Sequence, residues 1–117
     1  MSSQESISFL VQVASNDLEI GEQWLPEPQE NDAYEKLLST IKLRIEELID
    51  SDFERLLYLL YRSDVSEKKL RQALDESPSD EASNIIARMF IERQLEKYET
   101  RMRFSESQGE GSWEDDL

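Results

Sequence analysis

Residues 53–62 read FERLLYLLYR, and the predicted fold is built around this apolar segment. Seven of its ten side chains are Phe, Leu or Tyr, so a helix formed here is apolar around most of its circumference. Ser51 followed by Glu54 is a capping-box signal and predicts a short helix from about Asp52 to Arg62. Such a helix is either the buried centre of a bundle or part of a binding groove.

A long helix is predicted on the N-terminal side of this stretch. Apolar side chains between Tyr34 and Ile49 recur every three or four residues, the spacing that lines one face of an α-helix. Asp32 and Glu35 supply a capping signal for its start. We therefore expect the helical domain to begin near residue 32.

Two further helices are predicted on the C-terminal side. Asp64 with Glu67 three residues later predicts the start of a short third helix that ends near Leu74. Pro78 suits the first turn of a fourth and longest helix, which we expect to end at about Arg103. The apolar residues in its two halves are offset around the helix, so its second half is expected to face something that the first half does not.

The expected fold is all-α, a compact four-helix domain in long, short, short, long order over residues 32–104. We expect an acidic arm or linker, partly extended or disordered, over residues 1–31, and a disordered acidic tail over residues 105–117. Short connections between the helices favour antiparallel or sharply angled neighbours. The alternation from Ile7 to Val13 leaves open an extended arm, a short helix, or an edge strand that pairs with another chain.

The net charge of −14 is concentrated at the two ends of the chain. Residues 1–35 hold 8 acidic residues and residues 104–117 hold 5, without any Lys or Arg, so the middle carries 14 acidic against 13 basic residues. Because like charges repel, we expect no nucleic acid and no membrane as a partner. The basic residues Lys68, Lys69 and Arg71 give only the outline of a helix-turn-helix.

The chain lacks the residues on which much common chemistry depends. It contains no His and no Cys, and its three glycines lie outside the predicted helical region. We therefore expect no phosphate-binding loop, thiolate metal site or histidine base, and we predict a non-enzymatic protein without cofactor, metal or catalytic residues. The absence of Cys fits a cytoplasmic location, and the longest apolar run is too short to span a membrane.

Carboxylates are the remaining candidates for catalysis or metal binding. They gather at helix ends and turns, where capping and solvation are their ordinary roles. A calcium loop that begins at Asp75 fails, because Asp80 occupies the place of the required Gly and Ile86 that of the bidentate Glu. The two groups are Glu46, Glu47, Asp50 and Asp52, and Asp75, Glu76, Asp80 and Glu81.

A resemblance to a known family covers residues 34–103. The stretch 52–74, DFERLLYLLYRSDVSEKKLRQAL, and the later segment 91–94, IERQ, carry it. This pattern resembles a family of small bacterial helical proteins that share the LLYR, the DVSE and a final helix of IxxRQ type. The resemblance implies a helical domain of a conserved type, and because that family has no assigned activity, it implies no site residues.

Two groups of residues are candidates for partner binding. Large apolar side chains occur in both acidic segments, namely Trp24 with Leu25, and Trp113. They suit docking into a groove on a basic partner. The alternative is that each Trp folds back on its own domain. The second group forms a possible groove or dimer face and consists of Leu57, Tyr58, Tyr61, Leu95 and Tyr98.

The sequence favours an interaction or regulatory module that binds an unknown protein partner or forms a homodimer. One alternative is an acidic polyanion mimic that occupies a nucleic-acid-binding protein. Another is a metal-dependent module built on carboxylates, including weak Mg²⁺ or Ca²⁺ binding.

Overall fold

Five α-helices and one short 3-10 helix form the part of the chain that the computed structural model describes, residues 4–76 and 79–111. All regular structure in these residues is helical, which confirms the all-α prediction, and the structure adds a fifth helix to the four predicted. The elements are α1 (Gln4–Asp17), η1 (Glu22–Trp24), α2 (Ala33–Ser51), α3 (Phe53–Arg62), α4 (Glu67–Glu76) and α5 (Ser79–Gly111).

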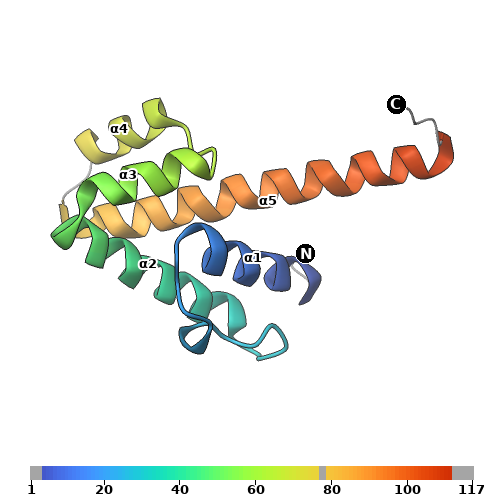
Figure 1. The fold of residues 1–117 in the computed structure, drawn as a ribbon, viewed down its shortest axis with the longest axis horizontal. Coiled ribbons are helices and arrows are strands. Elements are labelled where there is room, and N and C mark those ends of the chain that lie inside the picture. The colour runs from blue at the N-terminus through green and yellow to red at the C-terminus, as the bar shows by residue number, and fades with distance from the viewer. Residues whose placement is uncertain (1–3, 77–78, 112–117) are drawn as a thin grey trace.

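Helix α5 is the element on which the others assemble. Helices α1, α2 and α4 each pack against it, and α3 packs against α2 (Figure 1). The C-terminal part of α5 extends beyond the other helices. The helix continues to Gly111, past Arg103 where the sequence predicted its end, so residues 105–111 are helical.

The hydrophobic core draws side chains from all five helices. Phe90 of α5 is fully buried, together with Ile41 of α2 and Leu56 of α3. The buried residues of α2 fall three or four apart, which is why this sequence forms a helix with one face toward the core. They are Ala33, Leu37, Ile41, Ile45 and Leu48.

No helix in the described residues is long and apolar enough to cross a membrane.

Residues 7–13 lie in α1, so of the three alternatives for this segment the structure has the helix. Leu10, Ala14 and Leu18 fall four residues apart and are completely buried or nearly so. The alternation that suggested a strand arises because Phe9, Val11 and Val13 pack partly buried against the same core.

Helix α1 also explains the offset between the two halves of α5. The ring of Phe9 lies 4.9 Å from the ring of Tyr98, measured between centroids. The guanidinium group of Arg101 lies 5.7 Å from the centroid of the same Phe9 ring. The second half of α5 therefore faces α1, a neighbour that the sequence did not identify as a helix.

The start of α3 differs from the predicted capping box. Asp52 is the N-cap, and its Oδ1 accepts a hydrogen bond from the backbone N–H of Arg55 at 3.1 Å. Ser51 instead ends α2 and donates from its hydroxyl to the carbonyl oxygen of Glu47 at 2.7 Å. The predicted cap was therefore one residue early. Asp32 does occupy the N-cap of α2, but its side chain makes no capping hydrogen bond.

Candidate protein-binding surface

Helix α3 turns an aromatic face to solvent. It buries Leu56, Leu59 and Leu60 on one side only, so it is not the wholly buried centre of the bundle. Phe53, Leu57 and Tyr61 follow each other at four-residue spacing on the other side, and Tyr61 is 75% exposed. In the described part of the chain nine large apolar side chains are exposed, and four of them, the three above and Tyr58, belong to this ten-residue helix.

A groove of about 930 Å³ runs between α3 and α4, and we call it the α3–α4 groove. Its apolar lining comes from α3, from α4 and from the turn between them, and its charged lining comes from that turn, from α4 and from α5. The apolar residues are Phe53, Leu57, Tyr58, Leu60, Tyr61, Val65, Leu70 and Leu74, and the charged residues are Asp64, Glu67, Arg71, Asp75 and Arg93.

The turn between α3 and α4 sets the groove's geometry. Asp64 has a φ of 65°, in the left-handed region that Gly usually occupies after a helix. Its backbone N–H donates to the carbonyl of Tyr61, and the N–H of Val65 donates to the carbonyl of Leu60, both at 3.1 Å. These two bonds form a Schellman motif, so Asp64 ends α3 and does not cap α4 as predicted. Ser66 accepts from the N–H of Lys69 at 3.2 Å and takes that role.

Helix α5 holds this turn in place. Gln94 donates from its side-chain amide to the carbonyl of Ser63 at 2.8 Å, and Arg93 donates from Nε to the carbonyl of Asp64 at 3.0 Å. Lys97 Nζ lies 2.9 Å from Asp64 Oδ2, and this hydrogen bond lowers the pKa of the Asp64 carboxyl. Three neighbouring residues of α5 thus fix one end of the groove.

Charges of both signs surround the groove. Arg71 pairs with Glu67 along α4 at 2.7 Å. The guanidinium groups of Arg55 and Arg62 lie 5.8 Å and 5.7 Å from the centroid of the Tyr58 ring, within the range of a cation–π contact. The aromatic face of α3 therefore has basic neighbours at Tyr58 and charges of both signs on the α4 side.

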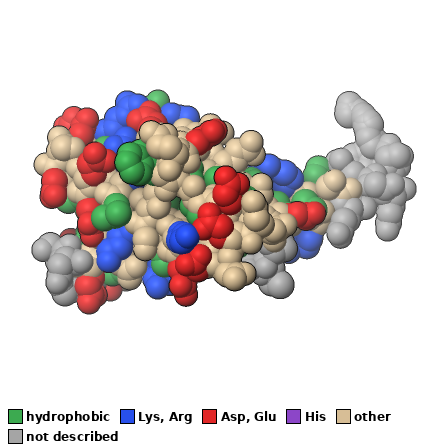
Figure 2. Space-filling model, turned by 90° about the horizontal axis from the view of Figure 1, so that it is seen from below, with side chains coloured by type: hydrophobic (Ala, Val, Ile, Leu, Met, Phe, Trp, Pro, Cys, Tyr) green, Lys and Arg blue, Asp and Glu red, His purple; other side chains and the backbone are tan. Residues whose placement is uncertain are grey.

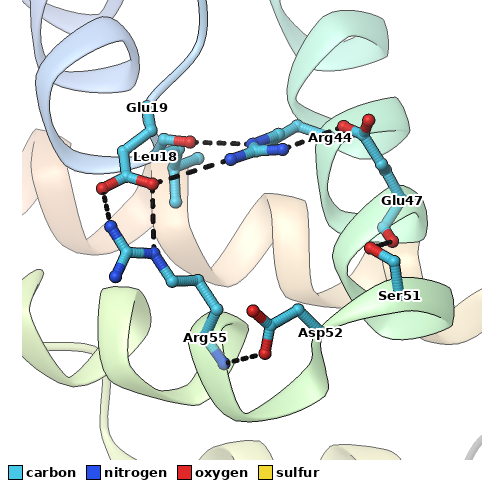
Figure 3. A network of polar contacts seen from close by, with 7 residues as sticks. All are labelled: Leu18, Glu19, Arg44, Glu47, Ser51, Asp52 and Arg55. Carbon is cyan, nitrogen blue, oxygen red and sulfur yellow. Dashed lines mark hydrogen bonds and ion pairs between the residues drawn. The ribbon is translucent and has the colours of Figure 1, made fainter.

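A separate polar cluster joins the end of α1 to α2 and α3 (Figure 3). Glu19, with a φ of 59°, accepts two hydrogen bonds from the guanidinium of Arg55, and these bonds lower the pKa of its carboxyl. Arg44 donates from Nε to the carbonyl of Leu18 at 3.0 Å and pairs with Glu47 at 2.9 Å. Because each of these charged groups has an internal partner, we assign the cluster a structural role.

The predicted groove or dimer face divides into two places. Leu57, Tyr58 and Tyr61 line the α3–α4 groove. Leu95 and Tyr98 are half-buried on α5 outside it, and Tyr98 packs on Phe9 of α1. Sequence reasoning did not include Phe53, Leu70 and Leu74 in this face, although the four-residue spacing of Phe53 from Leu57 and of Leu70 from Leu74 was a usable signal.

The predicted docking residue Trp24 lies on the surface. It belongs to η1, it is 68% exposed, and its carbonyl accepts a hydrogen bond from the hydroxyl of Thr40 at 3.2 Å. Together with Leu25, Pro26 and Lys36 it borders a shallow depression away from α3. Trp113 lies outside the described residues.

Figure 2 shows the face opposite α4, on which hydrophobic side chains form small, separate groups among charged ones.

The carboxylates proposed for a metal do not converge in the described part of the chain. No group there of three or more His, Cys, Asp or Glu side chains is placed to hold a metal ion. Glu46 accepts a hydrogen bond from the Ser83 hydroxyl at 2.9 Å, and Asp52 caps α3. Glu46 and Asp52 therefore serve the packing and capping of helices.

Comparisons of the chain with protein-family models, curated proteins and solved structures found no significant match. The resemblance to small bacterial helical proteins therefore stays a prediction, and the polyanion mimic stays an untested alternative.

Proposed function

We propose that this chain is a non-enzymatic protein-interaction module and that the α3–α4 groove is its binding surface. The observation that carries the proposal is the concentration of exposed apolar side chains on α3, four of the nine in the described residues. Scattered single apolar residues are normal on a protein surface, but a contiguous row beside a groove marks an interaction site. Tyr is also among the residues that dominate binding energy in interfaces.

The groove is formed before any partner arrives. Its turn is fixed by the hydrogen bonds of Arg93 and Gln94, and Val65 of the turn and Leu70 of α4 are buried in the core. A surface that is already ordered loses less conformational entropy on binding, which favours affinity. The apolar row of α3 beside the apolar side of α4 suits a helix as the occupant, because helical partners dock with residues three or four apart.

A photo-crosslinking amino acid in place of Tyr61 tests this proposal in cells that make the protein naturally. The matched control carries the same amino acid in place of Leu43, which is 64% exposed on α2 and lies outside the groove. We expect a specific protein adduct from position 61 that position 43 does not give. The absence of any adduct from position 61, or the same adducts from both positions, would contradict the proposal.

A further inference from the structure

We propose that the helix filling the α3–α4 groove is α3 of a second copy of this chain, so that two copies pair across a two-fold axis. This inference rests on the proposed function, because it names the occupant of the same surface. It follows from the local charge and from the shape of the exposed row on α3.

The local charge favours a second copy over a strongly charged partner. Residues 53–76, which contain α3 and α4, carry five acidic and five basic residues, although the whole chain has a net charge of −14. A surface that carries charges of both signs can pair with itself, because a two-fold axis can bring acidic residues of one copy near basic residues of the other. The charges elsewhere on the chain are screened over roughly 8 Å at physiological salt.

The exposed row has the geometry of a helix-packing ridge. Phe53, Leu57 and Tyr61 are spaced by four residues, and such i±4 rows are the ridges that interdigitate in the commonest class of helix pairs. The row spans about 12 Å along the axis at 1.5 Å per residue. Leu57 lies at its middle, so a two-fold axis passes near Leu57 and brings Phe53 close to Tyr61 of the partner subunit.

The charge of α3 itself also fits the groove. Helix α3 carries one acidic and two basic residues. The charged residues that line the groove are three acidic and two basic ones. The small net charges of the helix and of the groove lining therefore have opposite signs, whereas a strongly charged helix of either sign meets like charges in this lining.

Light scattering coupled to size exclusion on the full chain tests the pairing over a wide concentration range. We expect a particle of twice the 13.7 kDa chain mass. Leu57→Glu introduces a charge at the axis, and we expect at least a tenfold weaker dimer, whereas Leu43→Glu on α2 leaves the dimer unchanged. Tyr61→Ser is a second variant, at a site exposed enough to leave folding intact. The helical circular dichroism signal shows whether all three variants are folded.

A wild-type chain that stays monomeric throughout, or a dimer that Leu57→Glu and Tyr61→Ser do not weaken, overturns this inference. The two proposals fail in distinguishable ways. A monomer whose position 61 crosslinks to a different protein leaves the proposed function standing and removes only the second copy as occupant. A monomer without any adduct at position 61 removes both.

Discussion

The side-chain amide of Gln94 donates a 2.8 Å hydrogen bond to the carbonyl oxygen of Ser63, and both residues are buried. This bond satisfies a carbonyl at the end of α3, where the helix no longer supplies a partner. It also ties α5 to the turn that positions α4 beside α3. The shape of the α3–α4 groove therefore depends on a buried hydrogen bond between α5 and the turn before α4.

Replacing Gln94 by Leu tests this contact, because Leu has a similar volume but cannot donate. The buried carbonyl of Ser63 then loses its side-chain partner, and a buried polar group without a partner costs about 1–3 kcal/mol. We expect the free energy of unfolding, measured by urea denaturation, to fall by that amount. Gln72→Leu on the exposed side of α4 is the matched control, and an equal loss in both variants would contradict the account.

Asp64 offers a test of the left-handed turn. Asn tolerates a positive φ and removes only the ion pair with Lys97, whereas Val also adds steric strain there. We expect Asp64→Val to unfold at lower urea than Asp64→Asn, with a difference of about 1–2 kcal/mol in the free energy of unfolding. Equal stabilities of the two variants would show that the turn relaxes to another conformation.

Much of the fold was predictable from helical periodicity. The spacing of apolar residues identified α2, and the apolar stretch 53–62 identified α3 with nearly correct bounds. Capping signals were less reliable, since Asp and Ser recur near both ends of α3. The true cap at Asp52 and the left-handed turn at Asp64 depend on backbone geometry that residue types alone do not determine.

Two features could not be predicted from the sequence. The sequence does not distinguish a helix from a strand over residues 7–13, because partly buried Val and Phe side chains imitate the alternation of a strand. Only the packing of α1 against α5 decides between the two. Five residues were predicted to share the candidate face, but Tyr98 packs on Phe9 of α1 and Leu95 lies outside the groove. The register between helices decides which apolar rows meet. That register is a property of tertiary packing.

Leu10→Ala tests whether α1 is an integral part of the core. Leu10 is almost completely buried, and truncation of a buried Leu to Ala costs about 2–5 kcal/mol. We expect a loss of this size in the free energy of unfolding. Leu43→Ala on the exposed side of α2 is expected to cost less than about 0.5 kcal/mol. A loss at Leu10 as small as that at Leu43 would mean that α1 is only loosely attached.

The Glu19–Arg55 pair predicts a dependence of stability on pH. The pKa of Glu19 is lower in the folded chain than in the unfolded one, chiefly because of its hydrogen bonds with Arg55. Its stabilising contribution is therefore fully present above the unfolded value, about 4.3, and is lost as the pH falls through the folded pKa. We expect Arg55→Gln to flatten the decline in unfolding free energy below about pH 5.

Arg88→Gln is the control for this pH series, because Arg88 is exposed and forms no ion pair with another described residue. Urea denaturation of the wild type and of both variants between about pH 2 and 7 provides the measurement. The same acid-limb slope in wild type and Arg55→Gln would show that the pair contributes nothing in solution.

Disulfide crosslinking tests whether the α3–α4 groove binds protein by pairing with a second copy, because the chain contains no cysteine of its own. Leu57→Cys and Leu43→Cys each introduce a single thiol, one at the proposed axis and one on α2. Under mild oxidation we expect Leu57→Cys to form a disulfide-linked dimer rapidly and Leu43→Cys to remain largely monomeric, as read on a non-reducing gel. Failure of Leu57→Cys to crosslink, or equal crosslinking of the two variants, would contradict the pairing.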